Sequence, residues 1–127
     1  MTELNLIPWP ETQQFHQVRK YTHEYPEILN SKPVVKYRCK NKLDGSNMAI
    51  RLLFKDRQVS AQSREVVLTD GKDCYGFARW VRANKDKFVA WMDHFESKLK
   101  LQHEQLEGFV LFGEWSGKSI QNRCAIS

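Results

Sequence analysis

The stretch Lys42-Leu43-Asp44-Gly45-Ser46-Asn47 joins residues 34–43, in which apolar and polar residues largely alternate, to the mostly apolar residues 48–54. Alternation with a period of two is typical of a strand that buries one face. An Asp-Gly pair between two such segments favours a tight antiparallel connection. The stretch therefore predicts an antiparallel sheet around this turn, with a lysine two residues ahead of it.

The neighbouring segments extend this sheet. We expect a strand over residues 34–43, a second over 48–54 and a third over 58–64, with Lys55-Asp56-Arg57 as the turn between the last two. A further strand is predicted over residues 109–115, which is apolar until Glu114. A carboxylate that closes a buried strand would need a partner, because an unpaired buried charge is costly.

Two regions have helical patterns. Residues 11–25 predict a helix that Pro26 interrupts. Farther along, large apolar residues recur at three- and four-residue spacing, which predicts helices and a stripe that belongs to the core: Phe77, Trp80, Val81, Phe88, Trp91, Met92, Phe95 and Leu99. Gly108 is expected to end this region, so the fold class is α+β.

Composition limits the class of protein. A chain of 127 residues with 41% hydrophobic content suits one small globular domain or part of a larger one. It has no apolar run of membrane-spanning length and no secretory signal pattern. Cys39, Cys74 and Cys124 form no CxxC pair and are expected to be free thiols in a reducing compartment. We therefore expect a cytoplasmic protein without a membrane partner.

Positive charge is concentrated just before the Asp-Gly turn. The net charge is +5, and residues 32–42 hold five cations and no acid: Lys32, Lys36, Arg38, Lys40 and Lys42. A strand would place the last four on one face, where neighbouring cations favour loss of a proton from the Lys42 amine and make it nucleophilic. A solvated cationic strand remains the simpler alternative, and a polyanionic partner also fits.

Three short motifs occur in order along the chain: Lys42-x-Asp44-Gly45, Ser63-Arg64 and Phe112-Gly113-Glu114. They resemble the first motif, the arginine motif and the third motif of the covalent nucleotidyltransferases, which comprise ATP-dependent DNA ligases, RNA ligases and mRNA capping enzymes. Asn47 stands where DNA ligases and capping enzymes usually carry arginine. This position and the run from Gly113 to Gln121 are similar to RNA ligases of the phage RNA ligase 2 and kinetoplastid editing-ligase type. Asp44 departs from the phage enzyme, which has histidine there.

The resemblance implies an antiparallel-sheet nucleotidyltransferase domain of the ATP-grasp-like ligase type. Residues 1–127 would form a partial adenylyltransferase domain, with a lead-in and helix over 1–33 and the motif-bearing sheet and helices over 34–127. Later family motifs supply a base-stacking aromatic, a metal-binding glutamate and a phosphate-gripping Lys-x-Lys strand. Only six residues follow Gln121, so we expect the N-terminal half of the domain, unable to seal nicks alone.

The resemblance also implies residue roles. Lys42 would attack the α-phosphate of ATP and carry AMP, which then passes to an RNA 5′-phosphate before a 3′-hydroxyl displaces it. The nucleotide-binding residues would be Lys40, Asn41, Asn47, Arg64, Glu114 and Gln121. ATP and a divalent metal (Mg²⁺ or Mn²⁺) are the expected cofactors, and RNA, as a nicked duplex or as ends, is the expected partner. The sequence does not identify the metal ligands.

Other interpretations remain for these residues. A phosphate loop at Gly113 to Gly117 fails, because three residues separate the glycines where that loop needs four. A DNA ligase or capping-type enzyme, or a non-catalytic nucleic-acid-binding module, would share much of the pattern. Taken singly, Asn47 could be a turn former, Arg64 a solvated strand end, and Glu114 its salt-bridge partner.

Overall fold

The computed structural model of the chain describes residues 5–24 and 38–120. The chain divides into two compact units, of which one is Pro10–Lys42 and the other combines Met1–Trp9 with Leu43–Ser127. Among the described residues, no helix combines the length and apolar character needed to cross a membrane.

The unit Pro10–Lys42 contains helix α1 (Phe15–Glu24). Gln14 begins it: its backbone N–H donates to Oε1 of Gln17 at 2.8 Å, and its carbonyl accepts from the N–H of Val18 at 3.1 Å. This is one half of a capping box. The helix was predicted over residues 11–25, and it begins later because the capping bonds form at Gln14. Residue 25 lies outside the described residues.

The predicted strand over residues 34–43 is wrong for its described part. Residues 38–43 have no regular structure, and residues 34–37, Lys36 among them, lie outside the described residues. The side chains of residues 38–42 are all exposed, so their alternation buries nothing and no neighbouring strand pairs with them. Asp44-Gly45 is consequently not a hairpin turn, and Arg38, Lys40 and Lys42 lie on irregular chain.

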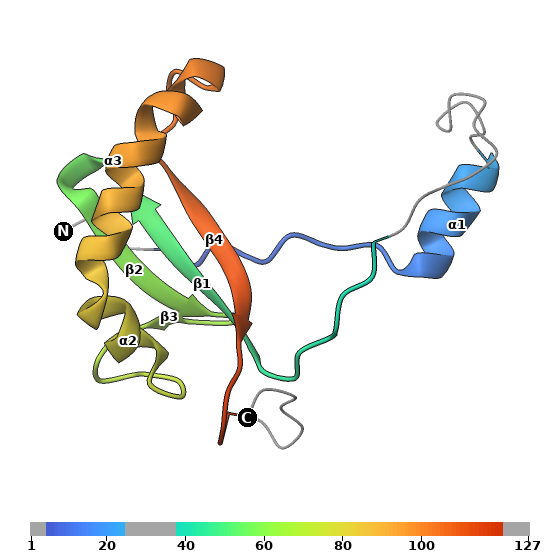
Figure 1. Ribbon diagram of the computed structural model, residues 1–127, viewed down its shortest axis with the longest axis horizontal. Coiled ribbons are helices and arrows are strands. Elements are labelled where there is room, and N and C mark those ends of the chain that lie inside the picture. Colours follow the sequence, from blue (N-terminus) through green and yellow to red (C-terminus); the bar gives the residue numbers. More distant parts are fainter. Residues whose placement is uncertain (1–4, 25–37, 121–127) are drawn as a thin grey trace. The chain divides into compact units, whose positions relative to one another are not determined.

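The other unit is built on a four-stranded antiparallel sheet (Figure 1). Its strands are β1 (Ser46–Leu53), β2 (Gln58–Ser63), β3 (Val67–Leu68) and β4 (Gly108–Trp115), in the order β3-β2-β1-β4. A short 3-10 turn, η2 (Lys55–Arg57), links β1 to β2. The strands predicted over 48–54, 58–64 and 109–115 are confirmed to within two residues. β3 is too short to leave a pattern in the sequence.

Helices α2 (Phe77–Ala83) and α3 (Lys85–Gln102) cover one face of this sheet. Met48, Ile50 and Leu52 project from β1 toward the helices and are buried, because alternate residues of a strand face the same side. On α3, Phe88 and Met92 are buried one helical turn apart. The predicted helical region is thus confirmed, except that α3 ends at Gln102 and Gly108 begins β4.

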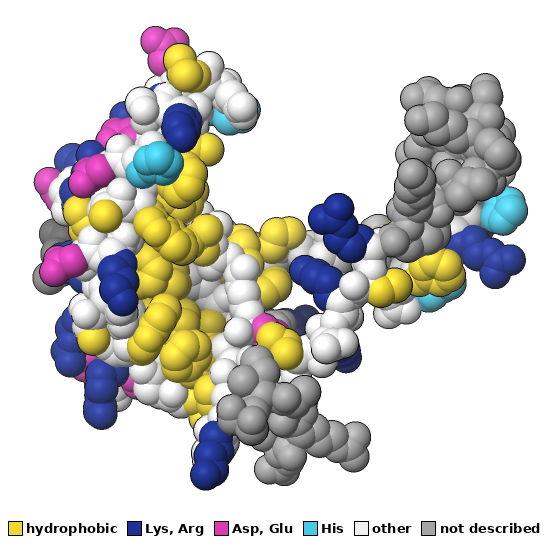
Figure 2. All heavy atoms as spheres, viewed as in Figure 1, with side chains coloured by type: hydrophobic (Ala, Val, Ile, Leu, Met, Phe, Trp, Pro, Cys, Tyr) yellow, Lys and Arg dark blue, Asp and Glu magenta, His cyan; other side chains and the backbone are white. Residues whose placement is uncertain are grey.

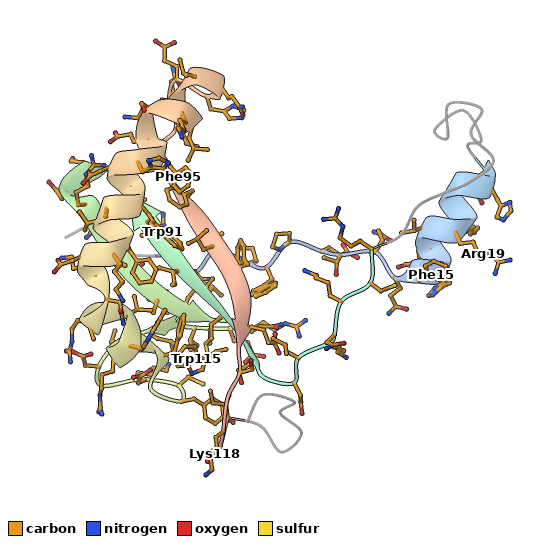
Figure 3. The ribbon with its side chains drawn as sticks, in the orientation of Figure 1. Phe15, Arg19, Trp91, Phe95, Trp115 and Lys118 are labelled. Atoms are coloured by element: carbon orange, nitrogen blue, oxygen red, sulfur yellow. The ribbon has the colours of Figure 1, made fainter. Side chains whose placement is uncertain are left out.

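The predicted aromatic core stripe is only partly buried. Trp80, Trp91 and Phe95 are 41%, 47% and 39% exposed, and Figure 2 shows apolar side chains gathered along this part of the surface. Figure 3 shows Trp91 and Phe95 projecting from α3 on its β4 side. The stripe is wider than the sheet face it covers, so its outer residues have no covering element among the described residues.

The opposite face of the sheet is crossed by the N-terminal segment Asn5–Trp9, which we call the strap. Ile7 exchanges two hydrogen bonds with the side-chain amide of Gln62, at 3.1 Å to Oε1 and 2.5 Å from Nε2. Arg51 donates to the carbonyl of Asn5 at 3.1 Å. The ring of Trp9 lies 5.1 Å from that of Phe112. In Figure 1 the strap passes behind the strands.

Candidate functional site

The predicted site residues fall into two groups. Lys40, Asn41 and Lys42 belong to the unit Pro10–Lys42, where all three are exposed. Asn47, Arg64 and Glu114 belong to the sheet unit. Gln121 lies outside the described residues.

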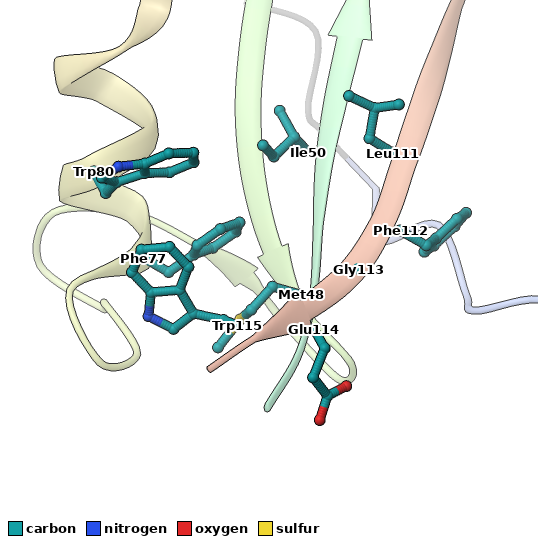
Figure 4. Close-up of a pocket in the computed structure, with 9 residues that line it drawn as sticks. All are labelled: Met48, Ile50, Phe77, Trp80, Leu111, Phe112, Gly113, Glu114 and Trp115. Atoms are coloured by element: carbon teal, nitrogen blue, oxygen red, sulfur yellow. The ribbon is translucent and has the colours of Figure 1, made fainter. Parts of the chain in front are cut away.

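Asn47 and Glu114 are direct register partners in the β1–β4 ladder. Residues directly opposite in an antiparallel pair have side chains on the same face, with Cβ atoms about 5 Å apart. Because Met48 faces the helices, the side chains of Asn47 and Glu114 lie on the strap face. Figure 4 shows the Glu114 carboxylate directed away from the rings of Phe77 and Trp115.

Arg64 is placed at the same end of the sheet by the register of β2. Ser63, the last residue of β2, pairs with Met48 of β1. Because the two strands are antiparallel, Arg64 follows Ser63 at the same level at which Asn47 precedes Met48. The Ser63 hydroxyl accepts from the backbone N–H of Val66 at 3.2 Å. This local turn leaves the Arg64 side chain exposed. The ends of three adjacent strands therefore carry an arginine, an asparagine and a glutamate.

Gly45, the last residue of the first motif, lies at this same end. A Cβ on Gly45 would lie 2.4 Å from the carbonyl oxygen of Trp115 and 2.9 Å from Cβ of Ser116, so only glycine permits this close approach. Asp44-Gly45 is thus held beside the residue that follows Glu114.

The charged side chains at the strand ends, Arg64 and Glu114, are not paired with each other. Among the described residues, no ion pair joins Arg64 to Glu114, and both side chains are exposed. The expectation that Glu114 closes a buried strand and needs a partner is therefore wrong, because water solvates its carboxylate. Both charges can meet a ligand.

A pocket of about 200 Å³ lies on the other face, between α2 and the end of β4. Its lining is apolar and includes Ile50, Phe77, Trp80 and Trp115. Figure 4 shows Phe112 and Glu114 pointing away from it, although both belong to its border. The pocket and the row therefore share the residue Glu114, but the Glu114 carboxylate is directed away from the pocket.

The described residues contain no group of three His, Cys, Asp or Glu side chains that could hold a metal ion. Glu114 is the one carboxylate of the row, and Mg²⁺ sites commonly combine one or two carboxylates with substrate phosphates. The residues present do not form a metal site by themselves. Cys39 and Cys74 are free thiols, and Cys124 lies outside the described residues.

The strap is a feature that the sequence patterns do not predict. Gln62 is 2% exposed, although it lies on the polar side of β2, where alternation predicts solvent. Trp9 stands between two prolines, which indicate extended chain but give no partner for the ring. The sequence could have indicated that Trp9 lies in extended chain and needs a packing partner. It could not have indicated that this partner is Phe112.

The chain matches the RNA ligase family over residues 35–125. This range includes all three motifs and every strand of the sheet. No curated protein and no solved structure matches the chain. The matched range covers more than half of the sequence, and the fold is the small α+β arrangement with an antiparallel sheet that the motifs implied. The chain therefore belongs to the RNA ligase family.

Proposed function

We propose that this chain performs the nucleotide-charging step of an ATP-dependent RNA ligase, with Lys42 as the residue that carries AMP. Family membership supports ligase-type nucleotidyl transfer in general. The observation that carries the finer proposal is the meeting of Gly45, Asn47 and Glu114 at one end of the sheet. These residues share the sheet end although nearly 70 positions separate Gly45 from Glu114, about half of a typical domain's length.

The complete ligase reaction, of which this chain is proposed to perform the first step, has three displacements at phosphorus. The neutral amine of Lys42 attacks the α-phosphate of ATP. The nitrogen–phosphorus bond forms as the bond to pyrophosphate breaks, and the amine loses a proton to water. An oxygen of an RNA 5′-phosphate then attacks the AMP phosphorus and frees the lysine. Finally, an RNA 3′-hydroxyl attacks the activated 5′-phosphate, forms a phosphodiester and releases AMP.

The row at the strand ends supplies groups suited to a nucleotide. Glu114 can accept hydrogen bonds from ribose hydroxyls, and the neutral amide of Asn47 can donate to ribose or phosphate. The guanidinium of Arg64 matches phosphate oxygens in charge and geometry. By resemblance, Lys40 would contact phosphate and the backbone at Asn41 the adenine edge. Phosphoryl transfer depends mainly on such positioning and charge neutralisation.

RNA is the proposed polymer substrate. Residues 38–42 carry Arg38, Lys40 and Lys42 as exposed cations, which suit a phosphate backbone. The family match favours RNA ligases over DNA ligases and capping enzymes. A non-catalytic RNA-binding module would share the cations but would form no covalent bond with AMP. A divalent ion would neutralise phosphate charge, but the described residues offer no dedicated site for it, and no step is assigned to it.

Covalent labelling tests the proposal. The purified chain is incubated at length with ATP labelled at the α-phosphate and Mg²⁺, and the labelled peptide is mapped. We expect slow labelling of Lys42 that is lost in Lys42→Ala and in Lys42→Arg, since a guanidinium stays protonated and cannot attack. Lys87→Ala, which removes an exposed lysine of α3, serves as the control and should keep the label. Label on another lysine, or undiminished labelling of Lys42→Ala, contradicts the assignment.

A further inference from the structure

The strap lies over one line of residues across the sheet. Gln62 pairs with Ala49, and Ala49 pairs with Phe112, so these three side chains share the strap face in a single cross-strand row. The strap is bound at both ends of this row, to Gln62 through Ile7 and to Phe112 through Trp9. Its passage explains why Ala49 in the middle is only 1% exposed.

The neighbouring row on the same face contains Asn47 and Glu114. These residues lie two positions along β1 and β4 from Ala49 and Phe112, which is about 7 Å along a strand. Trp9, seated on Phe112, is therefore beside the Glu114 end of the candidate nucleotide row. The strap therefore runs beside the row of Asn47 and Glu114. It belongs to none of the three motifs.

Gln62 binds the strap through two hydrogen bonds of the kind that the backbone of a neighbouring strand would make. Its amide accepts from the N–H of Ile7 and donates to the carbonyl of the same residue, as a paired backbone unit would. Because Gln62 is almost fully buried, removing its amide would leave both polar groups of Ile7 without their partner, at a cost characteristic of buried unsatisfied groups. The position of Ile7, and of Trp9 two residues later, is thus fixed by the sheet.

We propose that Trp9 is a positioning residue for Glu114 in the nucleotide site, and that Gln62 keeps Trp9 in place through the strap. This inference rests on the proposed function of the row. The indole fixes the ring of Phe112, two residues from Glu114 on the same face. The strap would therefore set how a ribonucleotide sugar meets Glu114.

Three variants of the 127-residue chain test the inference: Trp9→Ala, Trp9→Phe and, as the matched control, Trp91→Ala. Trp91 is a partly exposed tryptophan of α3, on the helix side of the sheet. Amide NMR spectra without ligand report the side-chain amide of Asn47 and the backbone N–H of Glu114, and an equilibrium titration gives the Kd for ATP. Trp9→Ala should shift both signals and raise the Kd about tenfold, the upper range for one aromatic pair. Trp9→Phe should restore both, and Trp91→Ala should change neither.

Gln62→Met, which keeps the side-chain length, provides a second route if Trp9→Ala does not fold. It should shift the same two signals and raise the Kd in the same direction. Signals unchanged in Trp9→Ala and Gln62→Met overturn the inference, even if the melting temperature falls. If the parent chain binds no ATP, this counts against the proposed function. The NMR signals of Asn47 and Glu114 then still show whether the strap positions the row. Shifted signals with an unchanged Kd overturn the assignment of Trp9 to the nucleotide site.

Discussion

Glu114 and Gln62 lie on the same face of the sheet, and their different surroundings separate a binding group from a structural one. Gln62 is buried, and both of its polar atoms are used by Ile7. Glu114 is exposed, and among the described residues no ion pair engages it. A buried polar group that is fully hydrogen-bonded holds the fold, whereas an exposed, unengaged carboxylate at a strand end contributes little to it. Removing the charge of Glu114 should therefore affect binding more than stability.

We expect Glu114→Gln to leave the melting temperature within about 2 °C of the parent, because surface substitutions usually change stability by less than about 0.5 kcal/mol. The same substitution should reduce labelling of Lys42 by tenfold or more, since a charge-assisted bond to a ribose hydroxyl is replaced by a neutral one. Thermal unfolding and α-phosphate labelling of the same preparations provide the measurement. Glu104→Gln, an exposed position after α3, is the control. A marked loss of stability with normal labelling would indicate a structural role for Glu114.

Helix α2 depends on a carboxylate that precedes it. Asp73 accepts hydrogen bonds from the backbone N–H groups of Cys74, Ala78 and Arg79 at 2.7, 2.7 and 3.1 Å. The bonds from Ala78 and Arg79 satisfy donors in the first turn of α2, which have no partner within the helix. Partial desolvation raises the pKa of Asp73. The three backbone bonds and the charge of Arg79 oppose it and lower that pKa below its ordinary value of 3.8.

The sign of the resulting pH dependence follows from this lowered pKa. A carboxyl with a depressed folded-state pKa stabilises the fold above its unfolded pKa, and the stabilisation is lost as pH falls through the folded value. Asp73→Ala should therefore cost about 1 kcal/mol at pH 7, the usual cost of replacing a capping side chain by alanine. The difference from the parent should shrink as the pH falls below about 4. Urea unfolding at pH 7 and pH 3 measures it. Asp70→Asn, which removes the exposed ion pair with Arg82, should change stability less, and a parent–variant difference independent of pH would contradict the role of Asp73.

Sequence periodicity predicted correctly the elements that bury one face on the common core. Strands β1, β2 and β4 and helices α2 and α3 follow their periodicity because each buries one face or stripe on the same core. The expected strand over residues 34–43 has the same period, but a strand also needs a partner, which no local pattern specifies. The strap was missed for the same reason, since Gln62 is buried by a residue 55 positions away. At the site, motif order located the strand ends, but only the register showed that Asn47 and Glu114 are paired.

The sheet unit as a whole has two unlike faces. The strap face carries Asn47 and Glu114 beside the strap, and Arg64 follows the neighbouring strand end of β2. The helix face continues into exposed aromatic rings, which lie beyond the part of the sheet that α2 and α3 cover (Figures 2 and 3). Aromatic side chains each contribute about 150–250 Å² of surface when buried. Several of them side by side approach the size of apolar patch that monomeric proteins rarely expose.

This aromatic surface predicts association of the isolated chain. The ring of Phe88 lies between those of Trp80 and Trp91, with centroids 5.9 and 5.8 Å apart. A molecule that covers one of the exposed rings would therefore also contact the next. We expect the sedimentation coefficient of the purified chain to rise with concentration in the micromolar range. The double variant Trp91→Lys with Phe95→Lys should remain monomeric there, because two charges on the surface would have to lose their hydration on contact. Leu101→Lys is the control: Leu101 is 87% exposed near the end of α3, apart from the rings, and its replacement should leave association unchanged. A parent chain that stays monomeric over the whole range would show that the rings are too dispersed to act as one surface. Equal loss of association in Leu101→Lys would place the contact at the helix end instead.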